Sequence, residues 1–142
     1  MAQSSDDTGS KARFLESYVP GKFRSNLLEL GRICGERRIK LYLCTLSFAL
    51  TAKDFSGDCT LPYFARTPAL LKLLIERYNE TIKDVARLTN ATVIDVNGFF
   101  SKLDGGAKLY SDPIHLSDEG NKILSKFIYD MVRPQMELYP DI

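Results

Sequence analysis

The sequence predicts an α/β fold in which a parallel sheet carries helices on both faces. Two observations indicate this class. Segments with helical apolar spacing alternate with short, nearly continuous apolar segments, in the order helix, strand, helix, strand, helix. The short apolar segments have the composition of strands that are buried on both faces, which is typical of parallel sheets. A chain of 142 residues is long enough for one domain with one hydrophobic core.

The N-terminal part of the chain divides into a polar segment and a helix. We expect residues 1–18, whose first half is rich in Ser, Asp and Gly, to be disordered or poorly ordered, and residues 19–142 to form the domain. Apolar residues recur at helical spacing from Phe23 to about Cys34, and Gly35 ends this predicted helix. An apolar run from Ile39 to Leu46 follows as the first predicted strand.

A long connection precedes the second helix. Residues 51–67 exceed the usual loop length, and the loop's aromatic pair, Tyr63 and Phe64, either packs on the core or forms a lid over a substrate. Thr67 then provides an N-cap and Pro68 a first helical residue. The apolar face of this helix continues to about Leu88, where Asn90 can end it in a left-handed conformation.

The C-terminal third contains the second strand and the last helix. Residues 92–96 form the strand, and a single helical turn follows over residues 97–103. Ser117 caps a helix that extends to about Val132, and Pro134 is expected to stop it. Two parallel strands do not make a stable sheet alone. Three alternatives therefore stay open: residues 14–19 add a strand, the chain pairs with another polypeptide, or the sheet is incomplete.

Composition and charge exclude several classes of function. The net charge of +1 gives no general attraction for nucleic acid or an anionic membrane, and the basic run at residues 37–40 is interpreted as a solvated helix end. No segment reaches the roughly 18–20 apolar residues of a membrane span. The polar N-terminus lacks a secretory signal, so a cytoplasmic protein is expected. Residues 79–81 and 90–92 match the N-glycosylation sequon, which matters only in a secreted protein.

Metal and cofactor sites are not expected from the titratable residues. Cys34, Cys44 and Cys59 have no metal-ligand spacing and are interpreted as reduced, mostly buried thiols. The single histidine, His115, excludes most zinc and haem sites. If the chain performs acid–base chemistry near neutral pH, His115 is the first candidate.

His115 follows Asp112 at a spacing that suits general-base catalysis. Within one turn the carboxylate can accept the Nδ1 proton and leave Nε2 free to act as a base. The loop that carries Asp112 and His115 lies after the second strand, so it can reach the carboxyl edge of the sheet. In open parallel sheets, ligands bind at this edge. The alternatives are a surface histidine and an aspartate that caps the start of a helix.

The longer string, residues 112–124, resembles the last conserved block of the SGNH, or GDSL, hydrolases, which are serine esterases, lipases and acylhydrolases. The shared pattern is Asp-x-x-His, a short polar turn, a glycine five residues after the histidine, here Gly120, and an apolar helix. Within this block, His115-Leu116-Ser117 and Gly120-Asn121 are most similar to the matching residues of the isoamyl acetate-hydrolysing esterases. The resemblance covers about residues 19–132 and implies the C-terminal portion of a flavodoxin-like three-layer α/β/α fold whose early strands are missing. It also implies that His115 is the base and Asp112 its orienting partner.

The rest of the family's machinery is missing from the sequence. Its Gly-Asp-Ser nucleophile block and the glycine and asparagine that donate to the oxyanion have no counterpart, so no nucleophile and no oxyanion hole are identified. Ser47, just after the first strand, is a weak substitute nucleophile. We therefore expect a small ester substrate only if an N-terminal half completes the chain, which alone is expected to be inactive. The alternative is a non-catalytic remnant or truncated product that self-associates through an unpaired strand edge.

Overall fold

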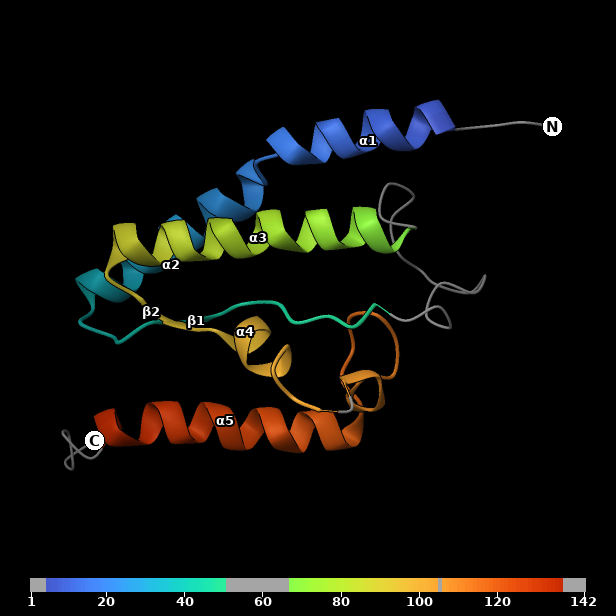
Figure 1. Cartoon of the computed structure of the whole chain (residues 1–142). Helices are drawn as coiled ribbons and strands as arrows, with labels where there is room; N and C mark the ends of the chain where they lie inside the picture. Colours follow the sequence, from blue (N-terminus) through green and yellow to red (C-terminus); the bar gives the residue numbers. More distant parts are fainter. Residues whose placement is uncertain (1–4, 51–66, 105, 137–142) are drawn as a thin grey trace.

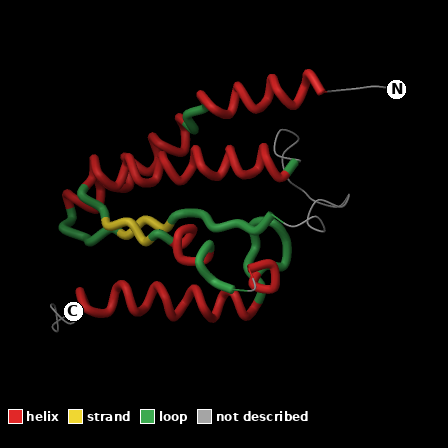
Figure 2. Tube along the Cα trace, in the orientation of Figure 1, coloured by secondary structure: helices red, strands yellow, loops and turns green. Residues whose placement is uncertain are grey.

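The computed structural model describes residues 5–50, 67–104 and 106–136, and it shows a small parallel sheet between two helical layers (Figures 1 and 2). Helices α1, α2 and α3 lie on one side of the sheet, and α4 and α5 lie on the other. This arrangement confirms the predicted α/β class. The elements are, in chain order, α1 (Ser5–Ser17), α2 (Gly21–Glu36), β1 (Tyr42–Cys44), α3 (Pro68–Thr89), β2 (Thr92–Ile94), α4 (Val96–Phe100), the 3₁₀ helix η3 (Gly106–Leu109) and α5 (Asp118–Met136).

Helix α3 has the caps that its sequence predicts. The Leu70 N–H donates to Thr67 Oγ1 at 3.3 Å, and Pro68 occupies the first turn. Asn90 ends the helix with φ 55° and ψ 30°, a left-handed conformation that asparagine tolerates better than most residues. These features are local, which is why the sequence alone could locate both ends of α3.

The two strands are parallel, and both are shorter than predicted. Tyr42 pairs with Thr92 and Cys44 with Ile94, so only three residues of each apolar run form strand. β2 cannot extend to Val96 because Asp95 caps α4, accepting the Gly98 N–H at 3.1 Å. Among the described residues no third strand is present.

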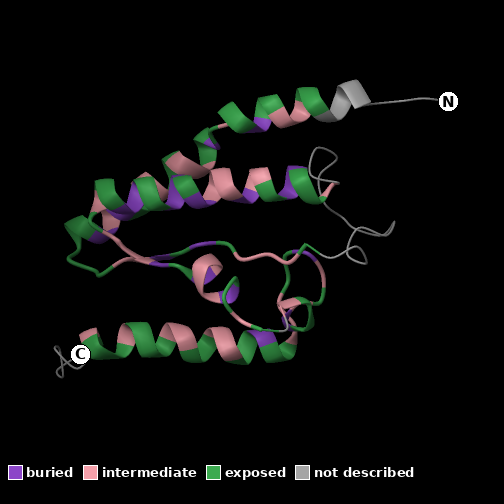
Figure 3. Cartoon of the chain, in the orientation of Figure 1, coloured by how far each residue is buried: buried purple, intermediate pink, exposed green. Residues whose placement is uncertain are grey.

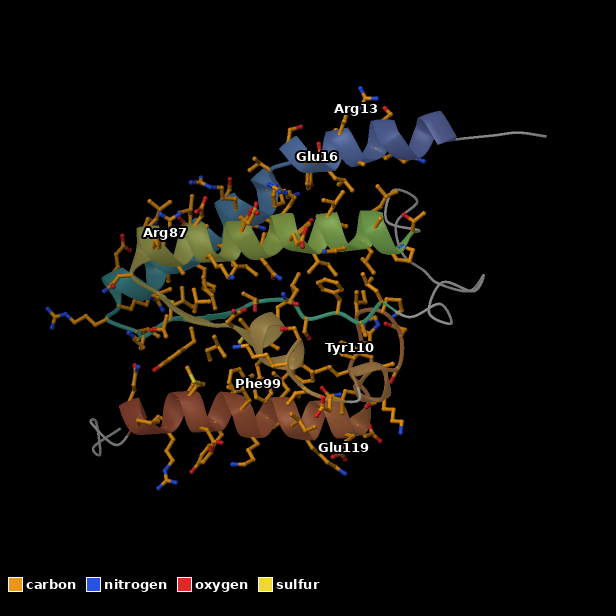
Figure 4. The ribbon with its side chains drawn as sticks, viewed as in Figure 1. Arg13, Glu16, Arg87, Phe99, Tyr110 and Glu119 are labelled. Atoms are coloured by element: carbon orange, nitrogen blue, oxygen red, sulfur yellow. The ribbon has the colours of Figure 1, made fainter. Side chains whose placement is uncertain are left out.

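The hydrophobic core lies on both sides of the sheet. On the α3 side, Leu43 packs with Ile82, Val85 and Ala86. On the α5 side, Phe99 of α4 stacks on Phe127, with ring centroids 3.9 Å apart and planes at 4° (Figure 4). Figure 3 shows that α5 is much less buried than α3; Gly120 is its single buried residue among those described.

Two structural features near the ends of the described chain bear on the sequence-based expectations. Residues 5–17 form α1, so the segment proposed as a third strand is largely helical; α1 packs against α3, and Leu15 is 1% exposed. Helix α5 continues through Pro134 to Met136. A proline removes one helical hydrogen bond but need not end a helix, and the next residue is anchored, since Tyr42 Oη donates to Gln135 Oε1 at 2.7 Å. The division of the chain into a poorly ordered segment, residues 1–18, and one domain, residues 19–142, stays a prediction.

Two further expectations concern the cysteines and the long loop. Cys34 is buried, but Cys44 is exposed, because its side chain borders an open hollow at the end of β1. Cys59, Tyr63 and Phe64 lie outside the described residues.

Candidate active site

The loop that carries the histidine is a tight turn whose ends pair. Tyr110 and Leu116 form an antiparallel bridge, and the Ser111 N–H donates to the His115 carbonyl at 2.8 Å. Tyr110 (labelled in Figure 4) lies at the start of this turn. Inside it, Asp112 Oδ1 accepts the backbone N–H groups of Ile114 at 2.9 Å and His115 at 2.8 Å. One carboxylate oxygen thus holds the backbone that presents the imidazole.

The other carboxylate oxygen meets the ring. Asp112 Oδ2 lies 2.6 Å from His115 Nδ1. Burial opposes ionisation of the Asp112 carboxyl, but hydrogen bonds from the Ile114 N–H and from His115 outweigh it and lower the Asp112 pKa. Asp112 is therefore ionised at neutral pH, as an orienting partner must be. The His115 side chain is 70% exposed, and no described residue bonds to its Nε2.

His115 borders an open hollow of about 430 Å³ between the end of β1 and α5. Its lining is mostly apolar and comes from three parts of the chain: Cys44 at the end of β1 with Thr45, Leu46 and Ser47 after it; Val96, Ile114, His115 and Leu116; and Asn121, Leu124 and Ile128 on α5. Ser47, the substitute nucleophile of the sequence prediction, shares this hollow with His115, but no hydrogen bond joins the two side chains. Such a hollow can hold the apolar part of a small molecule beside the imidazole.

A buried hydroxyl joins the carboxyl ends of the two strands. Thr45, 3% exposed, donates to Asp95 Oδ1 at 2.9 Å, and its Oγ1 accepts the Asn97 N–H at 2.9 Å. Desolvation opposes ionisation of Asp95, but the hydrogen bonds from Gly98 and Thr45 and the positive charge of Lys83 lower its pKa. Sequence reasoning missed Thr45, whose only signal is a hydroxyl in an apolar run.

Two further contacts fix the segment after β1. The Ala49 N–H donates to the Pro113 carbonyl at 3.0 Å, which ties this segment to the histidine loop. Asn79 of α3 bonds to both backbone groups of Leu46. Sequence reasoning missed this role of Asn79, although a polar residue between Ile75 and Ile82 in the apolar series of the helix could have signalled it.

The chain that carries this loop is similar to known lipases and acylhydrolases. The model of the GDSL-like lipase/acylhydrolase family matches residues 17–128. The chain belongs to this family. A lipase/acylhydrolase from Enterococcus faecalis has a similar fold, with a TM-score of 0.57 and 20% sequence identity. The similarity covers 81% of this chain and 52% of that one, so the chain spans about half the length of the Enterococcus protein. Curated proteins gave no significant match.

The described part of this GDSL-family chain has neither a membrane-spanning helix nor a cluster of metal-ligand side chains. No described helix is long and apolar enough to cross a bilayer. The described residues contain no group of three or more His, Cys, Asp and Glu side chains that could hold a metal ion. The Asp112–His115 pair and the hollow beside it thus make up the candidate active site.

Proposed function

We propose that this chain is the His–Asp half of a serine ester hydrolase, in which His115 is the general base and Asp112 orients it. The observation that carries the proposal is the 2.6 Å contact between Asp112 Oδ2 and His115 Nδ1 at the border of an apolar hollow. Membership of the GDSL-like lipase/acylhydrolase family supports an esterase or lipase type of reaction.

The proposed reaction uses the pair in two steps. His115 Nε2 takes the proton of a serine hydroxyl as its oxygen attacks the ester carbonyl, and the Asp112 carboxylate stabilises the imidazolium that forms. The imidazolium then gives this proton to the departing alcohol. In the second step the base activates a water molecule, which releases the acid and regenerates the serine. The hollow beside His115 would hold the apolar part of a small ester.

The serine and the oxyanion donors would come from an N-terminal half that completes the domain. Without the triad serine, catalysis falls by about 10⁶-fold in a serine hydrolase, and each lost oxyanion donor costs about 10²–10³-fold. We therefore propose that the 142-residue chain alone lacks serine-dependent ester hydrolysis.

Hydrolysis of p-nitrophenyl acetate and labelling with a fluorophosphonate probe test this proposal. We expect no stoichiometric labelling of the chain and no hydrolysis that the probe abolishes. Stoichiometric labelling at one serine would overturn it. If that serine were Ser47, loss of both label and hydrolysis in Ser47→Ala would assign the nucleophile to the hollow.

A second candidate function is non-catalytic self-association. It is favoured by the outer edge of β1, which pairs with no other strand of the described chain. A second copy could add its own β1 to this edge, as exposed edges commonly allow. Light scattering during size-exclusion chromatography should then show a dimer that dissociates on dilution, whereas a strict monomer at high concentration would exclude this candidate.

A further inference from the structure

Asn79 is a buried polar residue on the face of α3 that packs against the sheet, with only 6% of its surface exposed. Its Oδ1 accepts the Leu46 N–H at 2.7 Å, and its Nδ2 donates to the Leu46 carbonyl at 2.9 Å. A single carboxamide therefore satisfies both backbone groups of one residue. In a sheet, a neighbouring strand does this.

The pairing of β1 shows which edge Asn79 occupies. The Leu41 carbonyl accepts the Thr92 N–H at 2.9 Å, and the Thr45 N–H donates to the Ile94 carbonyl at 3.1 Å. The odd-numbered residues on either side of β1, Leu41 and Thr45, thus bond to β2. Because backbone groups alternate between the two edges of a strand, those of Tyr42 and Cys44 point to the outer edge. Leu46 is the next residue in this outer series, and Asn79 takes the place of a strand there.

The segment that follows Leu46 is anchored at its other end by the histidine loop. Three residues beyond Leu46, the Ala49 N–H donates to the Pro113 carbonyl, and Pro113 lies between Asp112 and His115 in the sequence. Residues 46–49 therefore span from the Asn79 carboxamide to the loop that presents the imidazole. Leu46 and Ser47, the first two residues of this segment, also line the hollow that His115 borders.

We propose that Asn79 is a positioning residue for the candidate active site. It ends the outer edge of β1 at Leu46, so that a further strand can pair at Tyr42 and Cys44 but not beyond. It also holds residues 46–49 in place as a support for the Asp112–His115 loop. This inference rests on the proposed function for its catalytic meaning, but the anchoring itself can be measured without any ester hydrolysis.

The same geometry gives Asn79 a structural role and makes its side chain inaccessible to glycosylation in the folded chain. An oligosaccharide would be attached to Nδ2, and this nitrogen is buried and bonded to Leu46. Glycosylation would require α3 to separate from the end of β1. The match at residues 79–81 is therefore a consequence of a structural asparagine followed two residues later by Thr81.

Amide hydrogen exchange of the full chain, followed by nuclear magnetic resonance, tests the proposal. In the unsubstituted chain the Leu46 amide should be protected, whereas the outer-edge amides of Tyr42 and Cys44 should exchange rapidly. In Asn79→Ala, exchange at Leu46 and Ala49 should rise at least about tenfold relative to the α3 core, and the His115 ring resonances should shift. In Asn79→Asp, the carboxyl can reproduce both hydrogen bonds to Leu46 only when it is protonated, because an ionised carboxylate would place an oxygen against the Leu46 carbonyl. Leu46 protection in this variant should therefore increase as the pH is lowered.

Thr81→Val is the matched control. Thr81 lies on the same helix and is 6% exposed, like Asn79, but its hydroxyl donates to the Arg77 carbonyl of α3 itself. This variant should leave the relative exchange at Leu46 and the His115 resonances unchanged. The proposal is overturned if Leu46 protection survives in Asn79→Ala, or if both variants accelerate all core amides equally. Release of Leu46 with unchanged Ala49 exchange and His115 resonances would also overturn it. Ester hydrolysis or probe labelling, by contrast, decides only the proposed function.

Discussion

Replacing Asp112 by asparagine should destabilise the chain in a way that depends on pH. The carboxylate accepts three hydrogen bonds, from the Ile114 N–H, the His115 N–H and His115 Nδ1. Asparagine keeps an acceptor for the backbone groups but loses the charge. Hydrogen bonds to charged groups contribute about 1.5–3 kcal/mol each when buried, and the 44% exposure of this side chain reduces that value. We expect a loss of about 1 kcal/mol at pH 7, or roughly 3 °C in Tm.

The sign of the pH dependence follows from the lowered pKa of Asp112. A carboxyl whose pKa is lower in the folded state stabilises that state above its unfolded pKa, about 3.9, and this contribution is lost as pH falls through the folded pKa. Urea unfolding at pH 7, 5 and 3 should therefore show a gap between Asp112→Asn and the unsubstituted chain that is constant from pH 7 to 5 and shrinks by pH 3.

Asp118 offers a control for the general effect of removing an acidic residue. It lies in the first turn of α5 and is exposed, whereas the ion pair of His115 is formed with Asp112. Asp118→Asn should cost about 0.5 kcal/mol through the helix dipole alone. If Asp112→Asn destabilised the chain no more than this control at pH 7, or if its effect persisted undiminished at pH 3, the Asp112 carboxylate would not be holding the loop as described.

Two further substitutions test the framework around the site. Thr45→Val removes the buried hydroxyl that bonds to Asp95 and to the Asn97 N–H, and should cost about 1–3 kcal/mol in urea unfolding, because two hydrogen bonds worth about 0.5–1.5 kcal/mol each are lost; a change below about 0.5 kcal/mol would contradict that role. Gly120→Ala should cost more than about 2 kcal/mol, since a Cβ would overlap the Leu109 carbonyl oxygen, whereas Gly35→Ala, with open space around it, should be neutral or stabilising. Equal unfolding midpoints for the two glycine variants would refute the packing argument.

Local features of the fold could be predicted from the sequence. The caps of α3 depend on Thr67 and Asn90 themselves, and the contact between Asp112 and His115 depends on a spacing of three residues. The glycine five residues after His115 also has a local reason, because Gly120 brings the first turn of α5 close to the backbone of Leu109.

Features that depend on distant contacts could not be predicted. The polar sequence of α1 gives no sign that Leu15 will be buried against α3. The apolar run around β1 does not show where pairing with β2 will stop, because this depends on Asp95 and Thr45 meeting across the two strands. The hollow requires the end of β1 and α5 to face each other, and neither segment alone indicates it.

The two halves of the core close chain loops of different size, and this bears on the order of folding. The Phe99–Phe127 stack joins residues 28 positions apart, whereas Phe23 and Tyr78, whose ring centroids are 4.9 Å apart, are separated by 55. Because closing a longer loop costs more conformational entropy, the α4–α5 layer should assemble in the earlier part of folding. The turn that carries His115 belongs to this early layer, so it can take shape before α2 docks on α3.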